Sequence, residues 1–379
     1  HELLGKLTVT KTDSETDRPI QGVVFDIIAD EDVIRDGETT PLIKKDTVAA
    51  TITTGADGTA SYDRLPIGAG DTAKYRVVEK DAPKPYVVDP TPRHIQFIRQ
   101  SDEATILYGM DWENTPQEGH VILNKKDTLD NVVEGVTFDV YATEDVVVNG
   151  QTIYENNQKI ATLTTDDTGM LDIDGIAIGD DGDTRLKFVE VSAPVPYIKQ
   201  GTGEYPITLK FKNGVAKVDG EIEATNDIAT AQIDITKLDD DTDDPIEGAV
   251  FDVYARETVS LPNGDVLVEK DEKIDTITTN AEGKASIDNL YVDADGTPYE
   301  FVETSVPRPY VIPQETTTVT VKYKDINTAH VTASATITNM TTPGIVDVIK
   351  DDSETHKPVE GAVFDIIANE EIRINGKLI

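Results

Sequence analysis

The sequence predicts an all-β protein made of tandem β-sandwich domains, and two observations carry this prediction. Along the 379 residues, short alternating runs rich in Val, Ile, Thr and aromatic side chains are separated by Gly, Pro and Asp turns. Such runs are typical of strands, and no helical period extends beyond a few residues. The whole pattern also returns after about 112 residues, which is the size of one sandwich domain.

The repeat is clearest in a short segment that occurs four times. It reads Pro-Ile-Gln-Gly-Val-Val-Phe-Asp at residues 19–26 and returns in similar form at 131–139, 245–252 and 358–365. Because a period this long corresponds to a domain and not to a solenoid repeat, we expect four copies. Their ranges are 1–116, 117–228, 229–342 and, as the start of a fourth domain, 343–379. The short joints predict an elongated, semi-rigid rod, and the incomplete fourth copy indicates a fragment of a longer protein.

Three strands of each complete copy carry a polar residue where the alternation calls for a core side chain. This residue is a lysine on the first strand, a glutamate on a middle strand and an asparagine on the last. Each shares a strand face with the residues two and four positions before it. The first copy has Leu7, Val9, Lys11; Tyr75, Val77, Glu79; and Met110, Trp112, Asn114. The later copies have Lys125, Glu190 and Asn226, then Lys237, Glu303 and Asn339.

Between the first and middle strands, each copy contains a Thr-Thr pair followed by a glycine-containing turn. The glycines are Gly58, Gly169 and Gly283, and apolar alternation resumes directly after each of them. We interpret this pattern as a hairpin that leads a strand into the core.

The three inward polar residues are the ingredients of an intramolecular amide bond. A neutral lysine amine can attack the asparagine side-chain carbonyl and expel ammonia. Burial favours this reaction, because an apolar core lowers the pKa of a lysine and raises that of a carboxyl group. The protonated carboxyl group can then polarise the carbonyl and pass a proton to the departing nitrogen.

The alternative is a buried ion pair between lysine and glutamate, with asparagine as a hydrogen-bond partner. Buried ion pairs are costly to desolvate and are weak evidence of stability. This alternative also gives no reason for an inward asparagine on the last strand of every copy.

These residues lie in motifs that resemble the Cna B-type, prealbumin-like (SpaA-like) repeat domains of Gram-positive surface adhesins and pilins. The resemblance is carried by Val-Thr-Lys-Thr-Asp at 9–13, Gly-Val-Val-Phe-Asp at 22–26, Thr-Gly-Ala-Asp-Gly at 54–58 and the segment 75–87. It implies a prealbumin/Ig-like sandwich with self-formed isopeptide bonds Lys11–Asn114, Lys125–Asn226 and Lys237–Asn339, promoted by Glu79, Glu190 and Glu303. The loop after each glutamate departs from the family pattern, because it reads Pro-x-Pro-Tyr where Ala-Pro-x-Gly-Tyr is usual.

Composition excludes several other classes of function. The formal net charge of −38 argues against binding to nucleic acid or to an anionic membrane. No apolar run approaches the roughly 18 residues of a membrane span, so we expect no membrane insertion of this segment. The absence of cysteine removes disulfides, thiol catalysis and thiolate metal sites. Scattered histidines and the lack of a Gly-x-Ser-x-Gly motif predict no cofactor, no metal and no enzyme activity beyond the self-reaction.

Three further signals favour structural interpretations. The acidic run 239–244 could ligate Ca²⁺, but it lacks the central glycine and closing glutamate of an EF-hand loop, so we favour a solvated turn. The glycosylation sequon at Asn339 requires an exposed asparagine, whereas its strand phase points inward. Trp112 is in phase with Asn114 and is expected to shield the first triad.

The function predicted from the sequence is a structural stalk. We expect an extracellular segment on the cell wall or a surface fibre of a Gram-positive bacterium, which holds a tip that binds a host protein or glycan, with an anchor in the wall. Both the tip and the anchor would lie outside this segment. The alternative is a binding module that recognises a host protein or glycan through the variable stretches 31–48, 145–159 and 260–273.

Overall fold

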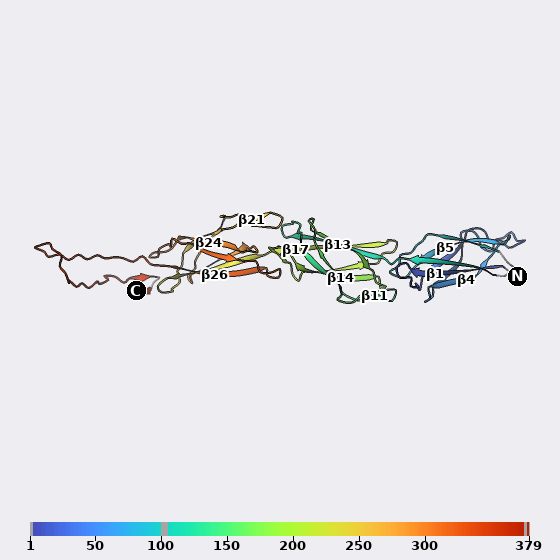
Figure 1. Cartoon of the computed structure of the whole chain (residues 1–379), viewed down its shortest axis with the longest axis horizontal. Coiled ribbons are helices and arrows are strands. Elements are labelled where there is room, and N and C mark those ends of the chain that lie inside the picture. Colours follow the sequence, from blue (N-terminus) through green and yellow to red (C-terminus); the bar gives the residue numbers. More distant parts are fainter. Residues whose placement is uncertain (1–2, 100–104, 375–376, 379) are drawn as a thin grey trace. The chain divides into compact units, whose positions relative to one another are not determined.

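A computed structural model describes residues 3–99, 105–374 and 377–378 (Figure 1). Every regular element in these ranges is a β-strand, which confirms the predicted all-β class. The chain divides into two compact units, one of residues 1–192 and 201–225, the other of residues 193–200 and 226–379. None of the described residues forms a helix long and apolar enough to cross a membrane.

The first copy is a sandwich of a three-stranded and a four-stranded sheet. Residues alternate between buried and partly exposed along the strands, as expected for sheets with one face in a core. Side chains from both sheets form this core, including Val9, Phe25, Tyr75 and Phe97. In strand order, the sheets are β4 (Thr59–Pro66), β1 (Leu4–Asp13), β7 (Thr105–Asn114), and β3 (Val48–Thr53), β2 (Val24–Ala29), β5 (Thr72–Asp81), β6 (Arg93–Ile98).

The second copy repeats the two-sheet plan and adds a short hairpin. One sheet contains β13 (Met170–Ala177), β8 (Glu118–Asp127) and β17 (Lys217–Ile228), and β15 (Tyr197–Lys199) pairs with the end of β17. The other sheet contains β12 (Lys159–Thr164), β9 (Thr137–Ala142), β14 (Asp183–Ser192) and β16 (Glu204–Lys210). The hairpin of β10 (Val146–Val148) and β11 (Gln151–Tyr154) lies in the variable stretch 145–159.

The third copy has the same plan as the first. Its sheets are β23 (Lys284–Tyr291), β18 (Thr230–Asp239), β26 (His330–Asn339), and β22 (Lys273–Thr278), β19 (Val250–Ala255), β24 (Thr297–Ser305), β25 (Thr317–Val321). The pair β20 (Val259–Ser260) and β21 (Val266–Val268) begins one residue before the variable stretch 260–273 and otherwise lies within it.

The predicted hairpin at the Thr-Thr turn is wrong. In the first copy, the strands before and after the turn are β3 and β4, and they lie in different sheets, β3 beside β2 and β4 beside β1. The same holds for β12 and β13 and for β22 and β23. Gly58 has a φ of +73°, and a Cβ there would meet the Lys11 carbonyl oxygen at 2.5 Å. The tight glycine turn therefore passes the chain from one sheet to the other beside the first strand.

The first and last strands of a copy are parallel neighbours. β1 pairs with β7 and β18 with β26 over ten residue pairs each. Parallel neighbours run in the same direction, so the chain enters a copy at one end and leaves it at the other.

The segment 343–379 contains few pairings in its described part. It holds a bridge between Asp351 and Pro358 and the strand pair β27 (Arg373–Ile374) and β28 (Lys377–Leu378). Lys350 is exposed, whereas the corresponding lysines of the other copies are buried.

Candidate functional site

The parallel pairing of first and last strands sets lysine and asparagine side by side. In the first copy, Lys11 lies opposite Trp112, and Asp13 lies opposite Asn114. Lys11 and Asn114 are thus diagonal neighbours whose side chains point to the same face of the sheet. In the third copy, Lys237 and Asn339 have the same register, because Lys237 lies opposite Ile337.

The glutamate comes from the facing sheet. In the first copy, Glu79 lies on β5, and Asn114 Nδ2 donates a hydrogen bond to Glu79 Oε1 at 2.5 Å. Lys11 Nζ donates to the Trp112 carbonyl oxygen at 3.2 Å. All three residues are at most 3% exposed, so the predicted triad is brought together in the core.

The third copy connects all three side chains directly. Lys237 Nζ donates to Asn339 Oδ1 at 2.5 Å and to the Ile337 carbonyl oxygen at 3.2 Å. Asn339 Nδ2 donates to Glu303 Oε1 at 3.0 Å. The amine therefore lies on the carbonyl side of the asparagine amide, and the carboxyl group lies on the side of the nitrogen that would leave.

In the second copy, the structure brings Lys125 and Glu190 together. Lys125 Nζ lies 3.8 Å from Glu190 Oε2, and both side chains are fully buried. Asn226 is also fully buried. Asn226 belongs to the second compact unit, and the two units are not placed relative to one another, so the pairing of Lys125 with Asn226 stays a prediction.

Burial shifts the acid–base equilibria of these groups in the direction that the reaction requires. Desolvation lowers the pKa of Lys11 and of Lys237 from 10.5 to about 8, even though the nearby glutamate opposes this shift. Desolvation also raises the pKa of Glu79 and Glu303 above the usual 4.5. Both shifts favour a neutral amine beside a neutral carboxyl group.

Several polar atoms of the triads make no hydrogen bond within the described residues. They include Glu79 Oε2 and Asn114 Oδ1 in the first copy, and Glu303 Oε2 in the third. A buried polar atom without a partner costs about 1–3 kcal/mol. Such costs are typical of sites retained for chemistry, because packing alone does not favour them.

Sequence reasoning missed one pair of buried polar residues beside the triad. Asp13 and Tyr86 are 1% and 2% exposed, and the Tyr86 hydroxyl donates to Asp13 Oδ2 at 2.5 Å. The signal was present, because every copy has an aspartate two residues after its lysine and the three complete copies have Pro-x-Pro-Tyr after the glutamate.

The other sequence signals have structural roles. Trp112 is 1% exposed and packs on Phe25 with ring centroids 5.1 Å apart, which confirms it as core. Asp239 binds the backbone N–H groups of Asp241 and Thr242, so this part of the acidic run forms a turn. Asn339 is 2% exposed, as its strand phase predicted.

Comparison with known families explains the repeated plan. The family of SpaA prealbumin-like fold domains matches residues 5–111, 119–224 and 231–336, which is most of the chain. The chain belongs to this family. The three matched SpaA domains contain the lysines and glutamates described above, and each asparagine lies two or three residues beyond the end of a match. The predicted resemblance is thus confirmed.

A solved structure agrees on the fold. The Bacillus anthracis TIE protein is 18% identical and superposes with a TM-score of 0.57, over 89% of this chain and 51% of that one. This chain therefore spans about half the length of that protein. The major pilin subunit BcpA of Bacillus cereus is 16% identical over 89% of this chain and 100% of its own, with a TM-score of 0.36. No curated protein sequence matches the chain.

Proposed function

We propose that this chain is a load-bearing stalk segment of a surface protein of a Gram-positive bacterium, and that each complete SpaA domain is locked by a Lys–Asn isopeptide bond. The observation that carries the proposal is the third triad. There, the Lys237 amine lies 2.5 Å from Asn339 Oδ1, and Glu303 accepts a hydrogen bond from the amide nitrogen.

The reaction needs no group from outside the domain. The neutral Lys237 Nζ attacks Cγ of Asn339, and protonated Glu303 gives a proton to the carbonyl oxygen. The carboxylate of Glu303 then relays the lysine proton to the departing nitrogen, and the bond between Cγ and Nδ2 breaks. The proton on the carbonyl oxygen returns to Glu303 as the new amide forms. One amide replaces another, ammonia leaves, and Glu303 ends protonated as it began. Contact within the fold supplies the effective concentration, which reaches about 10⁵–10⁸ M for well-oriented groups.

The strand topology supports a mechanical role for this bond. Because β18 and β26 are parallel neighbours, a pull on the chain ends loads them in opposite directions along their length. A bond from Lys237 to Asn339 would carry that load across the two strands. The segment between these two residues, which are 102 positions apart, would then bear little of the load.

The insertion of the second copy favours the stalk over a ligand-binding module. Arg18 of the first copy donates to Gln151 Oε1 at 3.3 Å, and Asn149 Nδ2 donates to the Pro19 carbonyl oxygen at 3.2 Å. The β10–β11 hairpin thus contacts the neighbouring copy. This contact supports a role in joining two domains.

The direct test is the intact mass of the folded protein. We expect the mass to lie three ammonia masses below the sequence mass, with tryptic peptides that join Lys11 to Asn114, Lys125 to Asn226 and Lys237 to Asn339. Glu190→Gln should leave its domain folded and restore one ammonia mass. Glu204→Gln, which changes an exposed glutamate of the same sheet, should restore none. An unmodified mass in folded wild-type protein would contradict the proposal.

A further inference from the structure

A buried aspartate lies two residues after the reacting lysine and accepts three hydrogen bonds. In the first copy, Asp13 Oδ1 accepts the backbone N–H groups of Glu15 and Thr16 at 2.8 and 3.0 Å. Asp13 Oδ2 accepts the Tyr86 hydroxyl at 2.5 Å. The pKa of Tyr86 is raised, mainly by burial and secondly by this hydrogen bond to Asp13. The hydroxyl therefore stays protonated and can donate. The aspartate thereby joins the end of β1 to the loop that follows the glutamate strand.

The third copy repeats this arrangement. Asp239 accepts the backbone N–H groups of Asp241 and Thr242, and its Oδ2 accepts the Tyr310 hydroxyl at 2.8 Å. Burial alone would raise the pKa of Asp239, but the bonds from Tyr310 and the two N–H groups lower it overall. The acceptor is therefore an ionised carboxylate, which makes the hydrogen bond from the hydroxyl a strong one.

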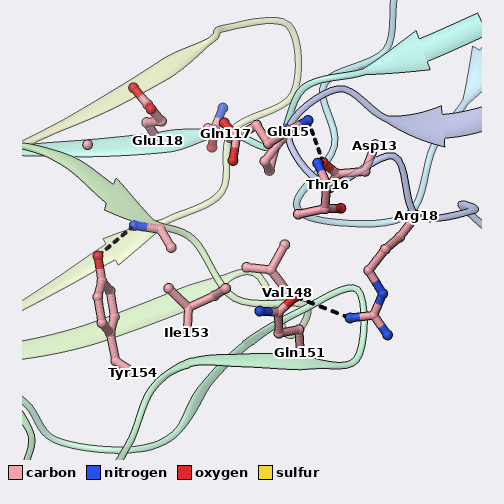
Figure 2. Close-up of a pocket in the computed structure, with 13 residues that line it drawn as sticks. Asp13, Glu15, Thr16, Arg18, Gln117, Glu118, Val148, Gln151, Ile153 and Tyr154 are labelled. Atoms are coloured by element: carbon pink, nitrogen blue, oxygen red, sulfur yellow. Dashed lines mark hydrogen bonds between the residues drawn. The ribbon is translucent and has the colours of Figure 1, made fainter.

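The two segments joined by this hydrogen bond hold the backbone of the reacting asparagine. Ser14, next to Asp13, donates its N–H to the Asn114 carbonyl oxygen at 3.0 Å. Three residues beyond the asparagine, Gln117 donates its N–H to the carbonyl oxygen of Pro85, which precedes Tyr86. Figure 2 shows Asp13 with the backbone of its turn, and Gln117 lining the same pocket.

The third copy holds its asparagine in the same way. Asp240 donates its N–H to the Asn339 carbonyl oxygen at 3.1 Å, and Thr342 donates its N–H to the Pro309 carbonyl oxygen at 3.1 Å. The same two contacts thus recur in two domains whose loop sequences differ. Both domains therefore hold the end of the asparagine strand through the same two backbone contacts.

We propose that Tyr86 and Tyr310 are positioning residues for isopeptide formation, because the Asp–Tyr hydrogen bond fixes the asparagine backbone within reach of the lysine amine. This inference rests on the proposed function. Neither the tyrosine nor the aspartate contributes a proton or an electron pair to the reaction. Their effect is geometric, and a displacement of about 1 Å at a reacting centre can slow a reaction about 10²-fold.

The first copy offers a matched control for a purely structural role. Tyr75 is also fully buried, and its hydroxyl donates to the Pro66 carbonyl oxygen at 2.7 Å, in a bond that does not involve the asparagine. Tyr75→Phe and Tyr86→Phe each remove one buried hydroxyl group and keep the ring. A difference between these variants in the rate of bond formation therefore reports on positioning.

The experiment follows the Lys11–Asn114 bond in newly made full-length protein. Wild type, Tyr75→Phe and Tyr86→Phe are synthesised in a cell-free pulse, stopped at intervals in denaturant, and digested for quantitative mass spectrometry. The bonds of the second and third copies serve as internal clocks. We expect Tyr86→Phe to slow the first bond about 10–100-fold and Tyr75→Phe to change it less than about twofold. Equal rates in the two variants would overturn the inference.

A second measurement separates this inference from the proposed function. Amide hydrogen exchange of Gln117 is compared in both variants on an Asn114→Ala background, in which no first bond can form. We expect exchange about tenfold faster in Tyr86→Phe than in Tyr75→Phe, in line with loss of a buried hydrogen bond. Equal exchange would overturn the positioning role. If wild type never loses ammonia, the proposed function fails, and the exchange result still decides whether the tyrosine holds the strand end.

Discussion

The first and third domains carry the same three residue types in the same register, yet their lysines bind different acceptors. Lys237 donates to Asn339 Oδ1 as well as to the backbone carbonyl opposite it. Lys11 donates to the backbone carbonyl opposite it, and none of the described residues donates a hydrogen bond to Asn114 Oδ1. Strand register therefore delivers the groups to one place, and the surrounding side chains decide how closely the amine approaches the amide.

The residue opposite the lysine is one visible difference. In the first domain it is Trp112, which lies between the Phe25 ring and the Arg93 guanidinium, whose Cζ is 4.0 Å from the ring centroid. In the third domain it is Ile337, a smaller side chain. The lowered lysine pKa is about 8 in both domains, so the two sites differ mainly in geometry and not in the supply of neutral amine.

The largest expected effect is mechanical. It tests whether the first and third domains resist tension in the same way through their proposed Lys–Asn bonds. Lys237→Ala and Lys11→Ala should each add an unfolding step of about 35 nm in single-molecule pulling, since roughly 100 residues extend by about 3.4 Å each. The wild-type domains should show no such step. A variant trace that matches wild type would mean that this bond never forms or lies off the path of the force.

Loss of a crosslink should next appear in thermal stability. Asn339→Ala prevents the bond of the third domain, and closing a loop of about 100 residues is worth about 4.7 kcal/mol in the chain-entropy treatment of crosslinks. We expect the melting temperature of that domain to fall by about 20 °C or more. Calorimetry of Asn339→Ala beside Asn327→Ala, which changes an exposed loop residue, measures the effect. Equal melting temperatures would contradict it.

The lowered lysine pKa predicts how stability depends on pH once the bond is removed. With Asn339 in place and no bond, burial lowers the pKa of Lys237 from 10.5 to about 8, and we expect a similar lowering in folded Asn339→Ala. Between these values the unfolded state binds more protons, so stability should rise with pH, by at most about 3 kcal/mol.

Denaturant titrations at pH 7.5 and 10.5 check this prediction. Asn339→Ala is compared with the double variant that also carries Lys237→Met, in which the rise should vanish. The stability of the first domain should show the same rise with pH in Asn114→Ala, because the pKa of Lys11 is also about 8. A stability of Asn339→Ala that falls over this range, after correction by the double variant, would exclude the buried neutral amine.

The smallest expected effect concerns the order in which the bonds form. The amine of the third domain already contacts the asparagine amide, whereas that of the first does not make this contact. We therefore expect the Lys237–Asn339 bond to form about tenfold faster than the Lys11–Asn114 bond. Time-resolved mass spectrometry of newly synthesised protein measures both in one sample, and a faster first domain would show that the static geometry does not control the rate.

Sequence alone determined the fold class, the repeat and the identity of the triads. Alternation with a period of two fixes which side chains point inward, so an inward Lys11, Glu79 and Asn114 could be recognised without coordinates. The long spacing of the copies then showed that the pattern was no coincidence. Loop chemistry is less informative, because the residues of the Thr-Thr turn predict a hairpin although the turn connects two sheets.

Only the tertiary structure decided which strands are neighbours and which hydrogen bonds are made. The parallel pairing of first and last strands joins residues about 100 positions apart, and local sequence holds no signal for such a contact. The bond between Tyr86 and Asp13 spans 73 residues for the same reason. Burial, and with it the pKa of each lysine, depends on the side chains packed around it from both sheets. The sequence therefore names the groups that we propose to react, and the packing of the sandwich sets their distances and shifts their pKa values.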